Sequence, residues 1–339
     1  MNHLTHIQTN KELLETRFFI LRLVREFFWK ENFTEVETPL IVNVPGQEPN
    51  IVPMKINIHN EKIVEFSGFL HTSPEYAMKK MLAAGFENIF YLGKCFRDRE
   101  SFGGSHNPEF TMMEWYRVGK NYVDIMNDAE NLFHFIAEKT EGHNGIDKIN
   151  LAKIKKQWQR KTMKSLWHEF LQINLDDFLT QEKMFELCVG KKYNVSKEES
   201  YEELFYRIFL NEIESKLGID VPLIVHEYPA QMASLAKLLE KDSRYAERFE
   251  VYFNGLELAN AFSELTDADE QESRLREERN FREKTGKDVY DIDQEFIGAL
   301  RAGMPESAGI ALGIDRMAML FTGCQEIDNV ITLPMSKLF

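Results

Sequence analysis

Residues 88–116 read NIFYLGKCFRDRESFGGSHNPEFTMMEWY. This stretch opens with an apolar run at 88–96 and closes with a second one at 109–116, and both patterns are typical of strands. A polar segment with two glycines, 97–108, separates the runs. We therefore predict a hairpin with an unusually long connection, and a long loop inside a compact domain often carries function.

The chain before this hairpin predicts a helix, a strand and a second helix. Residues 11–31 place apolar side chains at three- and four-residue steps, which indicates an amphipathic helix. The next stretch, 33–38, alternates like a strand and is followed by Pro39, which disfavours helix. Residues 73–75 (SPE) form a helix start, and 76–84 should be that helix.

The rest of the chain is predicted to be partly helical and partly strand. Residues 121–215 have a mostly helical pattern and are interpreted as an insertion or flank. A hairpin is expected at 250–260, turning at Asn254-Gly255. Residues 267–290 are charged and helical in pattern. A short apolar strand at 308–314 precedes a helix that should end at Gly323.

Composition favours a globular protein with an acidic surface. The 339 residues are 43% hydrophobic and 12% aromatic, enough for a sizeable core, and the net charge is −14. One basic stretch, 148–164, carries seven Lys or Arg and no acid. It is either a solvated face or a docking patch for a macromolecule. Overall acidity weakens a nucleic-acid function without excluding it.

Targeting and redox signals favour the cytoplasm. The N-terminal stretch lacks the apolar run of a signal peptide, and no segment has the 18 or so apolar residues of a membrane helix. Cys95, Cys188 and Cys324 are far apart and odd in number. A disulfide framework or a structural zinc site is therefore not expected.

Charged residues interrupt the apolar segments at several positions. They are Arg97, Glu114, Glu257, Glu264 and Arg316. Charges in such places are costly unless they are paired or bind a ligand. Taken alone, the pattern leaves internal salt bridges and a polar ligand site as open alternatives.

Three ordered motifs resemble those of class II aminoacyl-tRNA synthetases. The helix–strand–Pro39 unit is similar to motif 1, Phe96-Arg97 with 106–111 (HNPEFT) to motif 2, and 309–316 (GIALGIDR) to motif 3. The resemblance covers about residues 10–332. It implies an α+β fold with a six-stranded antiparallel sheet flanked by helices, and a homodimer formed partly through motif 1.

The amino-acid sequences of these motifs most resemble those of lysyl-tRNA synthetase-like enzymes. TSPEYAMKKML, EWYR and RFEVYFNGLELANAF look most like the elongation factor P (R)-β-lysine ligases. The motif 1 helix starts at about residue 10, so we expect one catalytic domain over 1–339 and no anticodon-binding domain. The resemblance implies activation of lysine or (R)-β-lysine by ATP with Mg²⁺, and transfer to a lysine of elongation factor P.

The resemblance also assigns roles to residues of the nucleotide site. Arg97 would bridge the substrate carboxylate and the α-phosphate, Arg316 would hold the γ-phosphate, and Phe110 would stack on adenine. Glu257 would ligate magnesium, with Glu264 as a second metal ligand. The expected ATP-binding set is Arg97, Asp98, Arg99, Glu100, His106, Asn107, Phe110, Glu257, Leu258, Gly313 and Arg316.

Recognition of the two substrate amines is assigned to buried acids. The expected set is Ser73, Pro74, Glu75, Glu114, Tyr116, Asn260, Glu264 and Ala311. Lysyl-tRNA synthetases usually have Gly where this chain has Ala311, and the added methyl should disfavour ordinary α-lysine.

The sequence is compatible with two other functions. A stand-alone enzyme that charges tRNA is disfavoured by the missing anticodon domain and the acidic surface. A non-catalytic paralogue that acts as a binding dimer is disfavoured by the presence of Arg97, Glu257 and Arg316.

Overall fold

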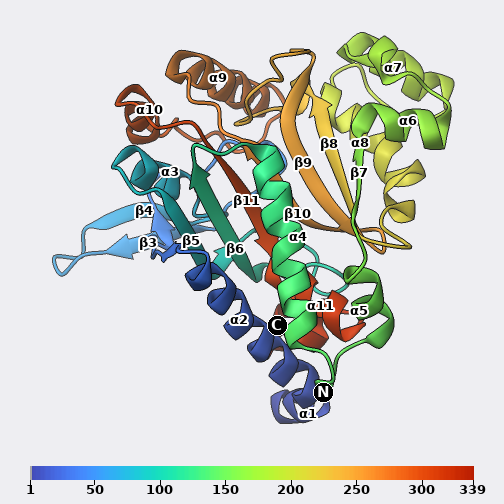
Figure 1. Cartoon of the computed structure of the whole chain (residues 1–339). Helices are drawn as coiled ribbons and strands as arrows, with labels where there is room; N and C mark the ends of the chain where they lie inside the picture. Colours follow the sequence, from blue (N-terminus) through green and yellow to red (C-terminus); the bar gives the residue numbers. More distant parts are fainter. Residues whose placement is uncertain (1) are drawn as a thin grey trace.

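The computed structural model describes residues 2–339 (Figure 1). The strands are β1 (Thr34–Glu35), β2 (Ile41–Val42), β3 (Lys55–His59), β4 (Glu65–Leu70), β5 (Asn88–Phe96), β6 (Glu109–Val118), β7 (Gln159–Thr162), β8 (Leu223–Pro229), β9 (Tyr245–Phe253), β10 (Leu256–Ser263) and β11 (Ser307–Gly313). The α-helices are α1 (His3–Thr9), α2 (Lys11–Lys30), α3 (Glu75–Ala83), α4 (Tyr122–Lys139), α5 (Lys148–Ile154), α6 (Met163–Leu171), α7 (Gln181–Gly190), α8 (Tyr201–Glu212), α9 (Ala268–Lys284), α10 (Gln294–Arg301), α11 (Ile314–Thr322) and α12 (Met335–Leu338).

The main sheet has eight strands, so the prediction of a six-stranded antiparallel sheet is wrong. Its order is β1-β5-β6-β11-β10-β9-β8-β7. The six central strands are antiparallel to their neighbours, whereas β1 pairs parallel with β5 and β7 pairs parallel with β8. The short outer strands occupy backbone groups that β5 and β8 would otherwise leave as unpaired sheet edges.

Several local predictions are confirmed. The long-loop hairpin is formed by β5 and β6, which pair from Asn88 with Arg117 to Phe96 with Glu109. The turn between β9 and β10 has positive φ angles at both central residues, 51° at Asn254 and 71° at Gly255. Such a turn matches the twist of the flanking strands.

One face of the sheet carries most of the hydrophobic core. Helices α2 and α4 cross this face (Figure 1), and Phe28 of α2 packs against Phe90 and Trp115, with ring centroids 5.1 and 4.9 Å apart. All three side chains are fully buried. Because side chains alternate along a strand, the neighbours of Trp115 on β6 point to the opposite face, where the polar residues gather.

Residues 121–215 combine helices with one strand. The α4 helix belongs to the core, and α6, α7 and α8 form a lobe beside β7 and β8 (Figure 1). In this lobe the ring centroids of Trp167 and Phe205 lie 5.0 Å apart. Within this region β7 extends the main sheet. Its polar sequence, QRKT, lacks a strand pattern, so pairing with β8 and not local preference determines its conformation.

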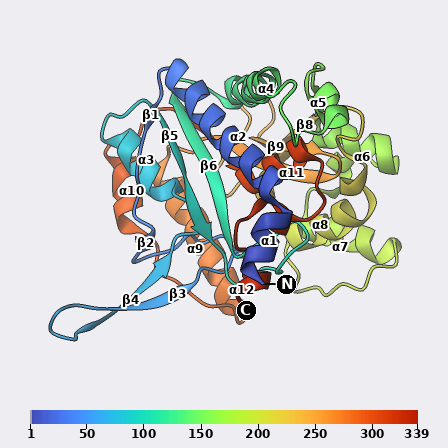
Figure 2. The same ribbon diagram turned by 90° about the horizontal axis from the view of Figure 1, so that it is seen from below.

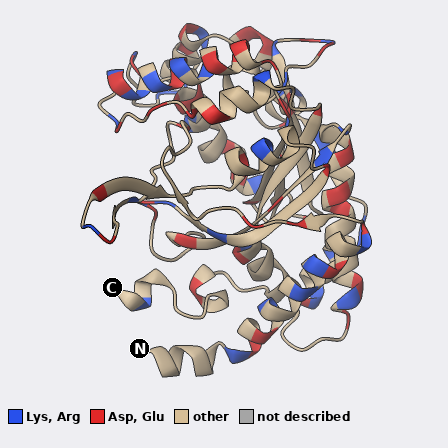
Figure 3. Cartoon of the chain, turned by 90° about the vertical axis from the view of Figure 1, so that its left-hand side faces the viewer, with Lys and Arg blue, Asp and Glu red and all other residues tan. Residues whose placement is uncertain are grey.

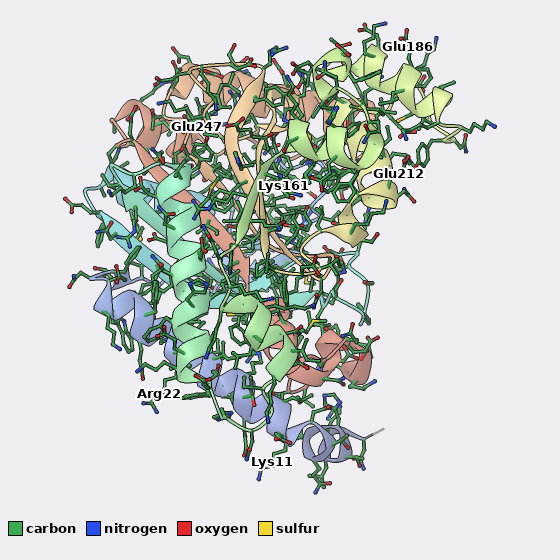
Figure 4. The ribbon with its side chains drawn as sticks, turned by 45° about the vertical axis from the view of Figure 1, so that its right-hand side comes forward. Lys11, Arg22, Lys161, Glu186, Glu212 and Glu247 are labelled. Carbon is green, nitrogen blue, oxygen red and sulfur yellow. The ribbon has the colours of Figure 1, made fainter. Side chains whose placement is uncertain are left out.

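Four of the seven basic residues in the stretch 148–164 pair with acids, among them Lys155, which lies 2.7 Å from Glu141. Arg160 lies 3.0 Å from Glu130 and Lys164 lies 2.5 Å from Asp176. Lys161, which is labelled on β7 in Figure 4, lies 2.7 Å from the carboxylate of Glu169 on α6. These contacts favour the solvated-face interpretation over a docking patch.

A small sheet of order β2-β4-β3 stands apart from the main one. Its β3–β4 hairpin projects from the body in two views (Figures 1 and 2). Elsewhere acidic and basic residues are interspersed along the helices (Figure 3). Over residues 2–339, no helix is long and apolar enough to cross a bilayer, and all three cysteines are free thiols.

Candidate active site

A row of four residues runs across one face of the sheet. Strand register pairs Glu114 of β6 with Ala311 of β11, Ala311 with Asn260 of β10, and Asn260 with Glu250 of β9. Directly opposed residues on neighbouring strands point to the same face. Two carboxylates, one amide and one small side chain therefore line the same surface, opposite to the apolar core.

A β-bulge turns Glu257 toward this row. Glu257 pairs with Tyr252 and Ala259 pairs with Val251, so Leu258 is an extra residue in β10. Glu257 lies three positions before Asn260, so strict alternation without a bulge would point Glu257 to the core face. With it, Glu257 shares the face of Asn260, and Leu258 is buried.

Arg316 is locked against Glu257 and the long loop. Its guanidinium donates to the main-chain carbonyl of Glu257 (2.8 Å) and to that of Ser105 (3.2 Å). A third contact joins Nη2 to Nε2 of His106 at 2.9 Å. Arginine only donates, so Nε2 accepts and the His106 proton resides on Nδ1.

The start of α11 is fixed by a buried ion pair next to Arg316. Arg17 of α2 donates to Asp315 at 2.8 Å and to the hydroxyl of Thr111 at 2.8 Å. The other Asp315 oxygen accepts from the main-chain N–H of Thr111 at 2.7 Å. Asp315 thereby ties together the three elements that resemble the synthetase motifs, and Arg316 follows it directly.

Arg97 completes a cluster with Glu257 and Arg316. Its guanidinium lies over the ring of Phe110 at 5.0 Å, and its buried Nε has no hydrogen-bond partner among residues 2–339. Burial, reinforced by Glu250, raises the pKa of Glu257 to about 7, against the opposing charges of Arg316 and Arg97. Three residues distant in sequence are therefore close enough to interact electrostatically.

His106 also faces this cluster. Burial and then the Arg316 charge lower the pKa of His106, while Glu100, whose carboxylate lies 4.0 Å away, opposes the shift. The imidazole is therefore neutral at pH 7, as its contact with Arg316 requires.

Other members of the expected nucleotide set differ in their surroundings. Asp98 and Arg99 are exposed in the loop, and Arg99 has a positive φ of 60°. Asn107 is buried and engaged by the backbone: its amide donates to the Glu109 carbonyl (2.6 Å) and accepts from the Met335 N–H (2.9 Å). That geometry supports a structural role for Asn107.

A cluster of buried acids, which we call the acidic pocket, lies at the other end of the row. Glu114 is 2% exposed and accepts from the hydroxyls of Ser73 (2.7 Å) and Tyr116 (2.6 Å). Burial, and then the charge of Glu75, raise the pKa of Glu114 to about 8. Ser73 also accepts from the Glu75 N–H (3.1 Å), and so joins the start of α3, after Pro74, to the pocket.

Glu264 belongs to this pocket and not to the Glu257 cluster. Oε2 of Glu264 lies 2.6 Å from Nζ of Lys79, its salt-bridge partner, and Oε1 has no hydrogen-bond partner among the described residues. Glu264 lies seven positions after Glu257, directly beyond the end of β10, on the order of 20 Å between Cα atoms. This placement argues against both residues holding one magnesium ion.

Gly309 makes room for Tyr116. The two residues oppose each other across β6 and β11, and a Cβ on Gly309 would lie 2.3 Å from Cε1 of the tyrosine. No side chain other than hydrogen fits there without displacing the ring. The hydroxyl contact between Tyr116 and Glu114 therefore depends on this glycine.

Three further residues, which were not predicted as site residues from the sequence, lie on this face. Glu250 accepts from Tyr228 (2.6 Å) and Tyr252 (2.5 Å), and Arg248 joins it to Asn260 with contacts of 2.7 and 3.0 Å. Both lie in RFEVYF (248–253), where charged and apolar residues alternate. This alternation could have predicted that the two charges share one face of a strand. The third residue, Lys79, gave no such signal, because it resembles any helical lysine.

The match to known families agrees with this geometry. Residues 3–337 match the family model of class II tRNA synthetases of the D, K and N type. The chain belongs to the class II tRNA synthetase family. Within this family it is 36% identical to an elongation factor P–(R)-β-lysine ligase of Vibrio parahaemolyticus over 325 residues, covering 95% of both chains.

Two further relatives carry the same name. The ligase of Yersinia enterocolitica is 35% identical over 326 residues, covering 95% of this chain and 94% of its own, and that of Proteus mirabilis is 36% identical over 325 residues, covering 94% and 93%. This class II synthetase therefore groups with the protein-modifying ligases of the family.

Proposed function

We propose that this chain activates (R)-β-lysine with ATP and transfers it to a lysine side chain of elongation factor P. The main support is that Arg97, Glu257 and Arg316 lie close together on one face of the sheet. The buried acids of the acidic pocket lie further along the same row of strand residues. The names of the relatives identify the acceptor class and the amino acid for those proteins.

The first step needs no general base. A carboxylate is ionised at neutral pH, and its oxygen attacks the α-phosphorus while the bond to the β-phosphate breaks and pyrophosphate leaves. Catalysis then rests on positioning and on neutralising charge. Arg97, with an unpartnered Nε, is available to bridge carboxylate and α-phosphate, and Arg316 lies where it can bind the distal phosphates.

Glu257 is the best candidate to hold magnesium. No hydrogen bond to its carboxylate is present among residues 2–339, and hard carboxylate oxygens are the ligands that Mg²⁺ prefers. Glu250 lies behind it, with both oxygens already hydrogen-bonded, and adds negative charge. The bound ion supplies neutralisation of phosphate charge.

Gly313 supports the placement of the nucleotide. Its φ is −75°, and a Cβ there would meet only ordinary contacts, the nearest at 3.7 Å from Arg316. Neither backbone conformation nor protein packing requires glycine at this position. Close approach of a ligand to the backbone explains it.

The acidic pocket fits a substrate with two ammonium groups. Glu114, Glu264 and Glu75 form its charged lining, and Oε1 of Glu264 has no hydrogen-bond partner within the described chain. Buried carboxylates of this kind bind ammonium groups strongly. In the second step a neutral amine of the acceptor attacks the acyl carbon, an amide bond forms and AMP leaves.

Radiolabel transfer tests this proposal. The chain is incubated with ATP, Mg²⁺ and labelled (R)-β-lysine or α-lysine, with elongation factor P or tRNA as acceptor. Label on the factor, with (R)-β-lysine preferred, is expected. Label on tRNA would instead establish the charging enzyme. If the chain shows no lysine-dependent ATP–pyrophosphate exchange, the proposed activity is wrong and the protein is a non-catalytic binding dimer.

We also propose a single catalytic domain, a homodimer through α2 and a cytoplasmic location, as expected for an enzyme acting on a translation factor. Phe18 and Trp29 on α2 are 50% and 54% exposed, and burying them in a partner would remove apolar surface from water. Analytical ultracentrifugation should give twice the 39.8 kDa chain mass. A monomer at micromolar concentration would contradict this part of the proposal.

A further inference from the structure

Lys79 lies deep in the acidic pocket. It belongs to α3 and is 1% exposed, yet its Nζ lies 2.6 Å from Glu75 and 2.6 Å from Glu264. The rings of Phe262 and Phe296 flank the ammonium at 5.1 and 5.7 Å. A buried ammonium is stable only when carboxylates compensate for the lost hydration, and here two of them do.

The charge state of Lys79 follows from these contacts. Burial alone would lower the pKa of Lys79, but Glu264 and Glu75 outweigh it and place the pKa above its ordinary value. The ammonium is therefore permanent at physiological pH. A permanent charge inside the pocket must be counted together with that of any substrate.

The net charge of the acidic pocket follows from the charged groups that form it. Three carboxylates, on Glu75, Glu114 and Glu264, face one internal ammonium. Burial raises the pKa of Glu114 and of Glu264 to about 8, so both are largely protonated in the free protein at pH 7. Once bound ammonium groups ionise both carboxyls, the pocket keeps two negative charges, the complement of a substrate with two ammonium groups. Without Lys79 the pocket would carry a third charge that such a substrate leaves unpaired.

We propose that Lys79 is a positioning residue, a fixed internal counter-ion that holds Glu75 and Glu264 in place and sets the pocket to accept two amines. This inference rests on the proposed function for its substrate, and on the two carboxylate contacts for its geometry. The ion-pair partners of Lys79 are Glu75 and Glu264, away from the phosphate site, so it affects substrate binding and not the chemical step.

Lys79→Met tests the inference in the full chain. Methionine keeps the length and fits between the two phenylalanine rings, but removes the charge. In ATP–pyrophosphate exchange, KM for lysine should rise at least about tenfold, since one buried charge loses its partner. KM for ATP and kcat at saturating lysine should stay within about twofold, because the phosphate site is untouched.

Lys80→Met is the matched control. Lys80 is the next residue of the same helix and pairs with Asp293 at 2.6 Å outside the pocket. Its loss should leave both KM values unchanged. If Lys79→Met leaves KM for lysine at the wild-type value, or raises both KM values equally, the counter-ion role is wrong.

A thermal-unfolding cycle without substrate separates this inference from the proposed function. Glu264→Gln should lower Tm in the wild type, because it strips a partner from Lys79, and should have little effect in the Lys79→Met background. Additive effects would overturn the ion-pair assignment. If the wild type shows no lysine-dependent exchange, the proposed function fails, and the unfolding cycle still decides the role of Lys79.

Discussion

Arg316 donates a 2.8 Å hydrogen bond to the main-chain carbonyl of Glu257, so the arginine is held by the backbone of the residue whose carboxylate is free for a cation. The same guanidinium contacts Ser105 and His106 in the long loop. A lysine cannot reproduce this three-way fork. Arg316→Lys should reduce lysine-dependent pyrophosphate exchange about a hundredfold, as loss of preorganised charge stabilisation does.

Glu257→Gln separates the two functions of that position. The substitution keeps the main-chain carbonyl that holds Arg316 but weakens the oxygen ligand for magnesium. The concentration of Mg²⁺ needed for half-maximal exchange should rise about tenfold or more, while Tm without metal stays constant or increases, because a carboxyl with a raised pKa is removed. An unchanged Mg²⁺ requirement would exclude Glu257 as the ligand.

Lysine binding should strengthen as pH rises toward 8. Burial and Glu75 raise the pKa of Glu114 to about 8, so in the free protein the carboxyl is largely protonated at pH 7 and cannot pair with an ammonium. KM for lysine should therefore fall between pH 6.5 and pH 8.5. In the Glu114→Gln variant, KM for lysine should be high over this whole pH range and should change less with pH. A wild-type profile that is flat, measured with ATP saturating, would contradict this.

The same shift affects the stability of the free protein. Because the pKa of Glu114 is higher in the folded state than in the unfolded chain, its contribution is full below the unfolded pKa and is lost as pH rises through about 8. Tm without ligand should fall over that range, and Glu114→Gln should reduce the fall. Calorimetry at several pH values, in buffers of equal ionic strength, measures both curves.

Gly309→Ala should damage lysine binding through Tyr116. The new methyl would lie 2.3 Å from the tyrosine ring, so the ring must move away from Glu114. We expect a loss of about 1–3 kcal/mol in stability and a higher KM for lysine. Gly298→Ala in α10, where a Cβ meets nothing within 4 Å, is the control and should be neutral or slightly stabilising.

Ala311→Gly should shift the preference between lysine isomers. Ala311 lies in register between Glu114 and Asn260, so its methyl limits the space in the middle of the polar row. Removing one methyl changes discrimination by about tenfold or more when it contacts substrate. The ratio of exchange rates with α-lysine and (R)-β-lysine should move toward α-lysine. An unchanged ratio would mean that Ala311 does not touch the substrate.

Much of the framework could be predicted because it is locally encoded. The β5–β6 hairpin has apolar runs with a polar loop, and the β9–β10 turn has Asn254-Gly255, so nearby residues suffice. The β7 strand could not be predicted, since QRKT has no alternating pattern and only β8 provides its partner. Edge pairing of this kind depends on the assembled sheet.

Some site residues could likewise be predicted from local sequence, and others could not. Arg97, Glu257 and Arg316 stand out as charges in apolar segments, and the structure brings them together. Lys79 has Lys80 beside it in an ordinary helical pattern, and only the approach of Glu264 from β10 distinguishes the two. Contacts between distant segments, which no local pattern contains, give the pocket its net charge.

The extra residue at Leu258 makes the spacing of β10 as important as its composition. Glu257 lies three positions before Asn260, so a β10 of the same composition that paired without the bulge would point this carboxylate into the hydrophobic interior, although every site residue type was present. A homologue with one residue fewer between Glu257 and Ala259 would need no bulge, because its acid would lie two positions before the amide and on the same face. In this family, a single-residue gap at that point of an alignment should therefore not be interpreted as loss of the site.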